Sequence, residues 1–311
     1  MNDSKKETIK TLVIRPSGLG DTLLLAPALS QLSHKVEFTL VGRRPAIDFL
    51  FHLVGNCLDY EKGGWHTLFS EKPRCEILPF QEVNKVISFL SDPDGCAEKG
   101  LRTCLKHIPL FSFPPFPPRG EKIHVAHYLA LCLCKSGLPV NPDKAIEEAK
   151  RRPLLGENRP VRTGYAIVLH PGSGGERKNY PPEFWLGLLK NRDIEVFKKR
   201  ILLLGHAESG SYQLFSENIS DLNVEIMYSP PREKLLLLLE GASLYIGHDS
   251  GITHLAAMLG TPTVAFFKKS DPLQWAPLGP YVTVIANDKS WRVIFGEIRK
   301  RIAGMGAILS R

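Results

Sequence analysis

The sequence predicts two α/β domains of the Rossmann-like type, each built on a parallel β-sheet. Three observations lead to this prediction. The chain has 311 residues, more than one hydrophobic core usually organises. In both halves short apolar runs alternate with helical patterns, which is typical of βαβ units. A polar segment with three prolines, residues 141–163, separates the two halves.

In the first half, apolar runs predict strands at residues 11–14, 36–42 and 85–90. A glycine-containing turn and a helical stretch through Leu32 follow the first strand. Residues 43–84 show no regular pattern. Residues 109–118, PLFSFPPFPP, cannot form a helix or a central strand, because proline fixes φ and removes an N–H donor. We expect them to form a surface loop or an extended crossing, followed by a helix over residues 124–138.

The second half repeats the alternation more regularly. Strands are predicted at residues 165–170, 200–205, 244–247, 263–267 and 282–286, and helices at 181–192, 232–242, 251–260 and 291–306. The predicted organisation is a first domain at 1–150, a linker at 151–163, a second domain at 164–290, and a terminal helix at 291–311. Packing of this helix back on the first domain is one option. Ligands in such sheets bind beyond the carboxyl ends of the strands.

The net charge of +8 is unevenly distributed, with +2 in residues 1–150 and +6 in residues 151–311. An anionic ligand or an anionic membrane surface would suit the second half, although a solvated basic surface is an equally simple explanation. Nucleic acid is not an expected partner, because no nucleic-acid-binding signature is present. No apolar run resembles a signal-peptide core or a spanning helix, so we expect a cytoplasmic protein.

All six cysteines lie between Cys57 and Cys134, and none forms a C-x-x-C pair. In a reducing compartment this pattern predicts thiols without a structural bond. The spacings of the cysteines and of the nearby histidines match no usual zinc pattern, so no metal site is predicted.

The first candidate site is the turn in residues 14–29, IRPSGLGDTLLLAPAL. Gly18 and Gly20 would allow a tight turn and the close approach of a ligand. Asp21 comes at the start of the next helix, where an aspartate is also a good N-cap, so a purely structural role is the main alternative. The dinucleotide fingerprint G-x-G-x-x-G is absent.

Two further turns lie in the second half. In residues 169–185, three glycines (Gly172, Gly174, Gly175) precede a helix beside Arg177 and Lys178. Exposed backbone N–H groups and adjacent cations favour phosphate, although the P-loop pattern is not matched. The alternative is a flexible loop with two solvated cations.

In residues 246–260, Asp249, Ser250 and Gly251 open a helix whose first turn contains Thr253 and His254. The free N–H groups of a helix N-terminus bind anions. A capping Asp or Ser with a hydrogen-bonded histidine is the structural alternative. Three such turns at strand ends, two of them in the more basic half, indicate a nucleotide-sugar site.

Together, these motifs resemble those of glycosyltransferase family 9, the ADP-heptose:lipopolysaccharide heptosyltransferase family. The similarity runs from residue 10 to about residue 280, and it is carried by three groups of residues: Arg15 with Gly20 and Asp21; His170-Pro171-Gly172-Ser173 with Lys178 and Trp185; and Asp249-Ser250-Gly251 with His254-Leu255-Ala256.

The resemblance implies a GT-B fold, an inverting mechanism, and no metal or other cofactor. Asp21 would be the general base, and Lys178 the cation on the donor diphosphate. Asp249, Ser250, Gly251 and His254 would hold ribose and phosphates, and Ser173 would also contact the donor. Glu208 would bind the nucleoside. Further contacts to phosphate or acceptor would come from Arg15, Gly18, Gly20 and Lys268.

The expected function is transfer of heptose from ADP-heptose to an anionic, lipid-linked saccharide acceptor of the lipopolysaccharide-core type. Such an acceptor implies peripheral contact with the inner membrane surface. Lys268 and Lys269 depart from the family pattern, which has small residues there; they either strengthen donor binding or indicate another donor. The alternatives are a transferase or epimerase that uses another nucleotide sugar, and a catalytically silent glycan-binding relative.

Overall fold

The structure is a computed structural model that describes residues 9–80, 83–156, 166–286 and 290–309. The chain forms two compact units, Met1–Glu148 and Ala149–Arg311. The boundary falls inside helix α6 (Pro142–Arg151), so the chain is helical where the predicted linker begins. Ala145 and Ala149 are buried on one face of this helix, which explains why a segment so rich in charge is ordered. Residues 157–163 of the predicted linker lie outside the described residues.

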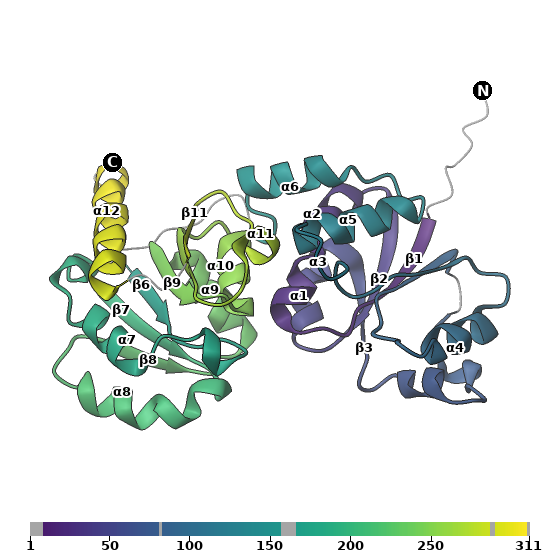
Figure 1. Ribbon diagram of the computed structural model, residues 1–311, viewed down its shortest axis with the longest axis horizontal. Coiled ribbons are helices and arrows are strands. Elements are labelled where there is room, and N and C mark those ends of the chain that lie inside the picture. The colour runs from purple at the N-terminus through teal and green to yellow at the C-terminus, as the bar shows by residue number, and fades with distance from the viewer. Residues whose placement is uncertain (1–8, 81–82, 157–165, 287–289, 310–311) are drawn as a thin grey trace. The chain divides into compact units, whose positions relative to one another are not determined.

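The first unit contains a parallel five-stranded sheet in the order β3-β2-β1-β4-β5, of which β1, β2 and β3 are labelled in Figure 1. Its strands are β1 (Ile9–Ile14), β2 (Val36–Gly42), β3 (Gly55–Asp59), β4 (Lys85–Ser88) and β5 (Leu110–Ser112). The strand order reverses between β1 and β4, where Ile14 pairs with Ser88. In an open parallel sheet this reversal marks the crevice for ligands.

The helices of the first unit are α1 (Leu19–Leu23), α2 (Ala26–Leu32), α3 (Phe51–Val54), α4 (Cys96–Leu105), α5 (Val125–Lys135) and most of α6. The helical stretch predicted to run through Leu32 is interrupted between α1 and α2. Pro27 lies in the first turn of α2, a position that needs no N–H donor. Strand β3 and helix α4 were not predicted, because β3 is short and α4 contains Gly100 and the charged residues Glu98, Lys99 and Arg102.

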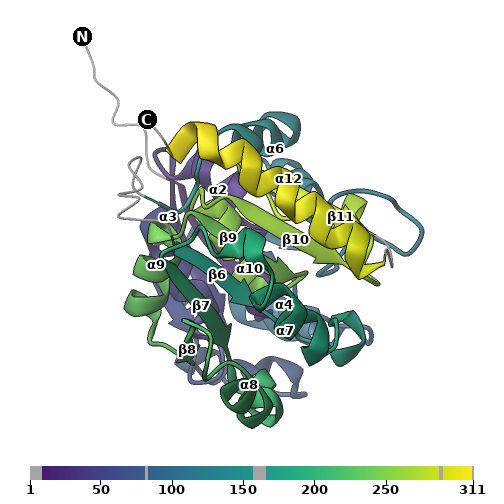
Figure 2. The ribbon, with the colours of Figure 1, turned by 90° about the vertical axis from the view of Figure 1, so that its left-hand side faces the viewer.

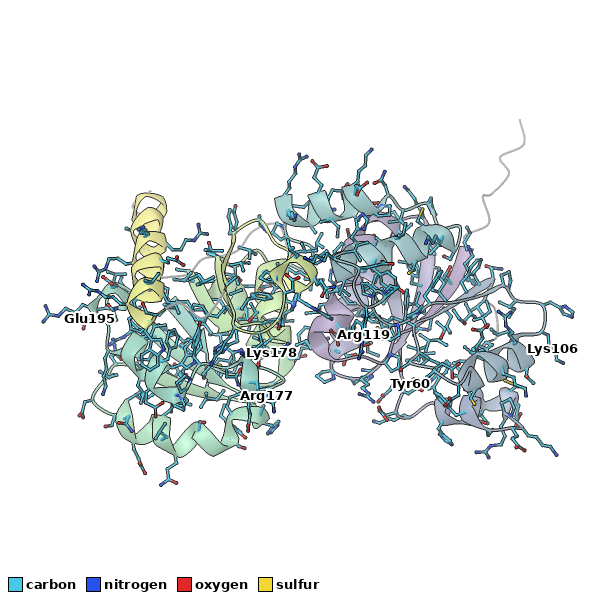
Figure 3. All side chains as sticks on the ribbon, viewed as in Figure 1. Tyr60, Lys106, Arg119, Arg177, Lys178 and Glu195 are labelled. Carbon is cyan, nitrogen blue, oxygen red and sulfur yellow. A yellow bond between two sulfur atoms is a disulfide. The ribbon has the colours of Figure 1, made fainter. Side chains whose placement is uncertain are left out.

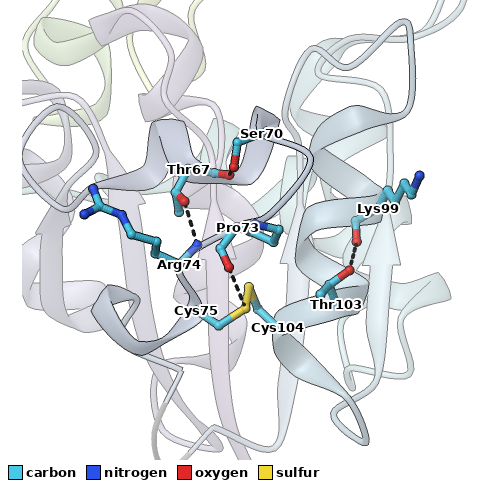
Figure 4. The surroundings of a disulfide bond; sticks show 8 residues. All are labelled: Thr67, Ser70, Pro73, Arg74, Cys75, Lys99, Thr103 and Cys104. Atoms are coloured by element: carbon cyan, nitrogen blue, oxygen red, sulfur yellow. Dashed lines mark hydrogen bonds between the residues drawn. A yellow bond between two sulfur atoms is a disulfide. The ribbon is translucent and has the colours of Figure 1, made fainter.

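A disulfide bond joins Cys75 to Cys104, so the prediction that all the cysteines are free thiols is wrong (Figure 4). Cys75 begins the short helix η3 (Cys75–Ile77) and Cys104 lies in the last turn of α4. The two residues are 29 positions apart, and only the fold brings their Cα atoms to 5.0 Å. The separation matches no short motif, which is why the sequence did not reveal the pair. The other four cysteines are free.

The proline-rich segment contributes β5 at the edge of the sheet, where a strand tolerates neighbouring prolines. This agrees with the prediction that the segment cannot be a central strand. The loop after β5 is anchored by two hydrogen bonds. The Tyr128 hydroxyl donates to the Pro114 carbonyl at 2.9 Å, and Arg15 Nη1 donates to the Pro115 carbonyl at 2.8 Å.

The second unit contains a parallel six-stranded sheet in the order β11-β10-β9-β6-β7-β8. Its strands are β6 (Ala166–His170), β7 (Lys199–Leu204), β8 (Glu225–Tyr228), β9 (Leu244–His248), β10 (Thr263–Phe267) and β11 (Val282–Ala286). β8 was not predicted. The strand order again reverses at one point, between β6 and β9. The glycine-containing turns after these two strands therefore meet at the expected ligand crevice.

The helices of the second unit are α7 (Pro182–Leu189), α8 (Tyr212–Asn218), α9 (Arg232–Gly241), α10 (Gly251–Met258), α11 (Pro272–Trp275) and α12 (Trp291–Leu309). Alternate residues of the sheet, such as Leu169 and Phe266, pack with α7, α8 and α12 into one apolar core. Ile294 and Ile298 place α12 in this core (Figure 2). The terminal helix therefore packs on the sheet of its own unit. None of the described helices is both long and apolar enough to cross a bilayer.

Candidate functional site

The carboxylate of Asp249 is the centre of the candidate site in the second unit. It follows β9 and is held by side chains from three other segments. Lys178 Nζ lies 2.8 Å from Asp249 Oδ2, and the Ser270 hydroxyl donates to the same oxygen at 2.5 Å. His254 Nε2 lies 3.9 Å from Oδ1. The structure thus brings together residues from the turns after β6, β9 and β10.

Asp249 is ionised in this environment. Burial alone would raise its pKa, but the nearby His254, the hydrogen bonds from Lys178 and Ser270, and the positive charge of Lys178 hold the pKa well below its usual range. Lys178 is more exposed to solvent than Asp249: its side chain is 41% exposed, whereas that of Asp249 is 8% exposed. Lys178, which is labelled in Figure 3, is therefore positioned by a buried carboxylate while its side chain remains partly exposed.

The N-terminus of α10 adjoins this carboxylate. Ser250 is the N-cap, and its hydroxyl accepts a hydrogen bond from the Thr253 N–H at 3.4 Å. Gly251 is the first helical residue, so the turn presents backbone N–H groups with no bulky side chain in front of them. An eight-residue helix with this cap provides the partial positive charge that favours phosphate. The predicted group Asp249, Ser250, Gly251 and His254 therefore comes together in one place.

A buried hydrogen-bond network in the interior of the unit holds these residues in place. His170 Nδ1 lies 3.0 Å from the Tyr245 hydroxyl, which lies 3.1 Å from Thr253 Oγ1. Thr253 donates to the carbonyl of His248 and also contacts Ser250 Oγ. Burial lowers the pKa of His170 to about 4, so this histidine is neutral. The network fixes the start of α10 relative to β6 and β9.

His248 is a second buried, neutral histidine. Its Nε2 accepts a hydrogen bond from the Tyr180 N–H at 2.7 Å, so Nδ1 carries the proton and donates to the Pro171 carbonyl at 3.0 Å. Burial, with the nearby His170, lowers its pKa to about 3. Through these two hydrogen bonds His248, at the end of β9, holds both ends of the segment between β6 and α7. The predictions from sequence did not include this residue.

Ser173 makes hydrogen bonds within the same segment. Its hydroxyl donates to Asn179 Oδ1 at 2.6 Å and lies 3.1 Å from the Gly175 carbonyl. Ser173 thus shapes the loop that carries Lys178, and its own side chain is nearly buried. Lys268 lies against the end of this loop, 3.5 Å from the Asn179 carbonyl and 5.5 Å from the centre of the Tyr180 ring.

Glu208 lies in η6 (His206–Ser211), the short helix after β7, and contacts the Gly172 backbone. A Cβ atom at Gly172 would lie 1.6 Å from Glu208 Oε1, so a larger residue there would require the Glu208 side chain to move. Glu208 Oε2 accepts the Gly205 N–H at 2.6 Å. The carboxylate therefore lies where the turns after β6 and β7 meet, and one of its oxygens caps its own helix.

An aromatic pocket at the end of β8 was missed from the sequence. The cavity, of about 360 Å³, is lined by Ser209, Tyr212 and Tyr228. The two tyrosine rings meet edge to face at 5.6 Å, and the Tyr228 hydroxyl lies 3.3 Å from His206 Nδ1. Both tyrosines are about 40% exposed, so their rings are accessible to a ligand. No local pattern links them, because β8 has only four residues.

Asp21 belongs to the first unit, where it lies in the first turn of α1 after β1. The N-cap of this helix is Gly18, so the interpretation of Asp21 as the cap is wrong. Gly18 has φ −64°, and neither Gly18 nor Gly20 is among the described glycines with positive φ. The turn therefore does not use a left-handed glycine, and the close approach of a ligand to Gly18 and Gly20 stays a prediction. A Cβ atom at Gly18 would come no closer than 3.9 Å to Asp21 Oδ2.

Arg15 is fully buried beside Asp21. Its Nε donates to the Asp21 backbone carbonyl at 3.1 Å, and its guanidinium lies 5.5 Å from the ring centres of Phe89 and Phe116. Burial lowers its pKa to about 10, against the influence of Asp21, so Arg15 stays charged. Within the described residues its Nη2 atom has no hydrogen-bond partner. Arg15 is thus a structural neighbour of Asp21 rather than an exposed phosphate contact.

No group of three or more His, Cys, Asp or Glu side chains in the described part of the chain is arranged to hold a metal ion. The cations and N–H groups around Asp249 are suited to an anionic ligand. The arrangement can bind a diphosphate through Lys178 and the start of α10, with an aromatic pocket at the same edge of the sheet.

Comparison with known proteins agrees with this geometry. The model of glycosyltransferase family 9 (heptosyltransferase) matches residues 103–297. Lipopolysaccharide heptosyltransferase 1 of Campylobacter coli is 32% identical over 126 residues, which is 39% of this chain and 36% of that protein. The aligned region thus spans little more than a third of that relative.

Two solved structures share the fold. Escherichia coli heptosyltransferase WaaC with ADP gives a TM-score of 0.69 at 16% identity, covering 94% of this chain and 99% of that one. E. coli ADP-heptose lipopolysaccharide heptosyltransferase II gives 0.66 at 15% identity, covering 96% and 100%. These likenesses confirm the predicted GT-B fold class, with two Rossmann-like units on parallel sheets.

Proposed function

The chain belongs to glycosyltransferase family 9, and from this premise we propose that it transfers a sugar from an ADP-sugar to a lipid-linked saccharide. The proposed donor is ADP-heptose, and the proposed acceptor is an anionic saccharide of the lipopolysaccharide-core type. The observation that carries the proposal is the pair formed by Lys178 and Asp249 at the N-terminus of α10. It supports a site for the leaving diphosphate.

Lys178 neutralises the charge that develops on the leaving diphosphate. Asp249 fixes the ammonium group in advance, so little reorganisation is needed as the bond to the sugar breaks. The N–H groups at Gly251 and the following residue bind the other phosphate oxygens. Lys268, near the same loop, adds a second cation to the site. Together these groups replace a divalent metal as the electrostatic clamp, so the proposed reaction needs no metal.

The nucleoside lies toward β7 and β8 in this proposal. The pocket of Tyr212 and Tyr228 takes the adenine base, because exposed aromatic rings stack on nucleobases. Glu208 holds the ribose hydroxyls, for which a carboxylate is a suitable acceptor. Its Oε2 already accepts the Gly205 N–H, so Oε1, beside Gly172, is the oxygen proposed for the ribose.

Asp21 is the proposed general base. Inversion requires one displacement in which the acceptor hydroxyl attacks the anomeric carbon and loses its proton. A carboxylate is a weak base at neutral pH, so it accepts the proton late, after the hydroxyl has become acidic in the transition state. The hydrogen bond from Arg15 to the Asp21 carbonyl fixes the backbone of the base.

A thermal-shift panel tests the donor assignment. Full-length protein is heated with ADP, UDP, GDP or CMP at equal concentration, since a ligand that binds only the folded state raises its stability. We expect the largest shift with ADP. Turnover of ADP-heptose is then measured with and without EDTA and should persist. A larger shift with another nucleotide would reject the donor, and strict dependence on Mg²⁺ or Mn²⁺ would reject the metal-free clamp.

A further inference from the structure

The first unit contains a cavity of about 350 Å³ at the carboxyl ends of β4 and β5. Its wall includes Ser88 and Asp92 from the end of β4 and beyond, Glu98 from α4, and Ser112, Phe113 and Pro115 from β5 and the proline segment. The volume lies at the lower end of the roughly 300–1,000 Å³ that is typical of small-molecule sites. It is suited to one sugar ring rather than to an oligosaccharide.

The cavity lies next to the point where the strand order of the first unit reverses. β1 and β4 are neighbours there, and the Phe89 N–H donates to the Ile14 carbonyl at 2.9 Å. The turn after β1 carries Asp21, and the segment after β4 forms part of the cavity wall. Ligands of open parallel sheets bind at this crevice. The topology therefore places the cavity beside the proposed base.

Arg15 connects the cavity to Asp21 directly. Its Nη1 donates to the Pro115 carbonyl in the cavity wall, while its Nε donates to the Asp21 carbonyl. One buried guanidinium thus fixes both the backbone of the proposed base and one wall of the cavity. A group bound in the cavity would therefore have a fixed position relative to Asp21, as an acceptor must have relative to its general base.

The charge in the cavity wall is negative. Asp92 accepts the N–H groups of Ala97 and Glu98 at 3.0 and 2.8 Å, which fixes its charge at the start of α4. Glu98 Oε1 is paired with Arg102 at 2.7 Å. Among the described residues that line the cavity, none is a lysine, arginine or histidine. A phosphate or carboxylate in the cavity would lose its hydration and face two carboxylates without a cation in the wall.

For a sugar ring without negative charge, by contrast, binding in the cavity is favourable. Its hydroxyl groups can donate to the carboxylates, and its C–H face can pack on the Phe113 ring. Phe113 stacks on Phe89 at 5.9 Å, so this surface is held in place. We propose that the cavity is the subsite for the acceptor and that it takes one sugar ring carrying no negative charge. This rests on the proposed function; any anionic groups of the acceptor lie outside the cavity.

Saturation-transfer NMR on the full-length protein tests the proposal without any donor. The probes are the methyl glycosides of glucose, glucosamine and glucuronic acid, and glucose 6-phosphate, at equal millimolar concentrations. We expect transfer to methyl glucoside and at least as much to methyl glucosaminide, and several-fold less to the two anions. Equal or stronger transfer to an anion, or no transfer to any probe, would overturn the proposal.

Two variants locate the binding. Phe113→Leu keeps an apolar side chain but removes the ring, and it should reduce the transfer to methyl glucoside several-fold. Phe69→Ala, which removes an exposed ring from the same unit outside the cavity, is the matched control and should leave the transfer unchanged. Unchanged transfer in Phe113→Leu would place the sugar elsewhere. Glu98→Lys should shift the preference toward the anions, and an unaltered preference would also count against the site.

The ADP thermal shift separates this proposal from the function on which it rests. The cavity variants should keep the parental shift with ADP, since every lining residue belongs to the first unit. Loss of ADP binding in the parent protein would reject the proposed donor even if the sugars bind. Failure of the sugars to bind, with normal ADP binding, would reject only the acceptor subsite.

Discussion

Lys178 and Asp249 are 71 residues apart in the sequence, and their Nζ and Oδ2 atoms lie 2.8 Å apart in the structure. The pair forms because β6 and β9 are neighbours in the sheet, which brings the turns after these strands together. A buried carboxylate thereby holds a partly exposed cation. This arrangement gives the strongest support for a diphosphate site, and the first prediction concerns it.

Lys178→Ala should weaken the binding of ADP far more than that of adenosine. A charge-assisted hydrogen bond to phosphate contributes about 1–3 kcal/mol, so we expect the Kd for ADP to rise roughly 5- to 150-fold. Calorimetry with both ligands measures this difference. Arg177→Ala is the matched control, since Arg177 is the adjacent, exposed cation, and it should have little effect. Equal losses for ADP and adenosine would remove Lys178 from the phosphate site.

Asp21→Asn should lower the turnover roughly 10²- to 10⁴-fold, the usual contribution of a general base. Because the N-cap is Gly18, the change removes no cap, and the melting temperature should stay within a few degrees of that of the parent. Affinity for ADP should be unaffected. Turnover, melting temperature and ADP binding are measured on the same preparation, with the exposed Glu37→Gln as control. Near-normal turnover in Asp21→Asn would show that the base is another residue.

Stability should fall as the pH is lowered from about 6.5 to 4. His170 and His248 have folded-state pKa values near 4 and 3, mainly because they are buried, whereas an unfolded histidine titrates near 6.5. In this window the unfolded chain binds protons that the folded chain does not, so the free energy of unfolding decreases with acid. Each histidine contributes a slope of up to about 1.4 kcal/mol per pH unit.

Urea unfolding at several pH values checks this prediction. His248→Gln should be less stable than the parent at pH 7 but should show a shallower loss of stability with acid. The control is His107→Gln, which changes an exposed histidine and should keep the parental slope. A slope that is the same in all three proteins would mean that His248 takes no part in the acid response.

Reduction of the Cys75–Cys104 disulfide should destabilise the first unit. Closing a loop of about 30 residues constrains the unfolded chain by roughly 3–4 kcal/mol in the loop-entropy estimate. Cys104→Ser should therefore lower the urea midpoint, whereas Cys96→Ser, at an exposed free cysteine, should not. Dithiothreitol should lower the midpoint of the parent and leave that of Cys104→Ser unchanged. An identical midpoint for the parent with and without reductant would contradict the bond.

Strands with strong apolar runs were predictable from the sequence. β2 and β10 have the predicted bounds, Val36–Gly42 and Thr263–Phe267, because each is an uninterrupted β-type run. β3 and β8 were not predictable because they are short. α4 was not predictable because its ten residues include Gly100 and three charged side chains. The helix at Asp21 was placed correctly, but its cap was not, because a cap is defined by local backbone angles that the residue types do not fix.

The sequence by itself determined the alternation of strands and helices, and with it the edge at which ligands bind. Parallel strands all end on the same side of their sheet, so the turns containing Asp21, Ser173 and Asp249 could be recognised as candidates from their residue types alone. The region that the family model matches, residues 103–297, includes the turns of Ser173 and Asp249.

Only the tertiary structure decided which of these side chains meet. The partnership of Lys178 with Asp249, the contact of Glu208 with Gly172, and the bond between Cys75 and Cys104 all join segments that lie far apart in the chain or in separate loops. Hydrophobic periodicity specifies which face of an element is buried, but it does not encode the order of strands in a sheet. That order is fixed by the packing of the whole unit, and the side-chain contacts at the site follow from it.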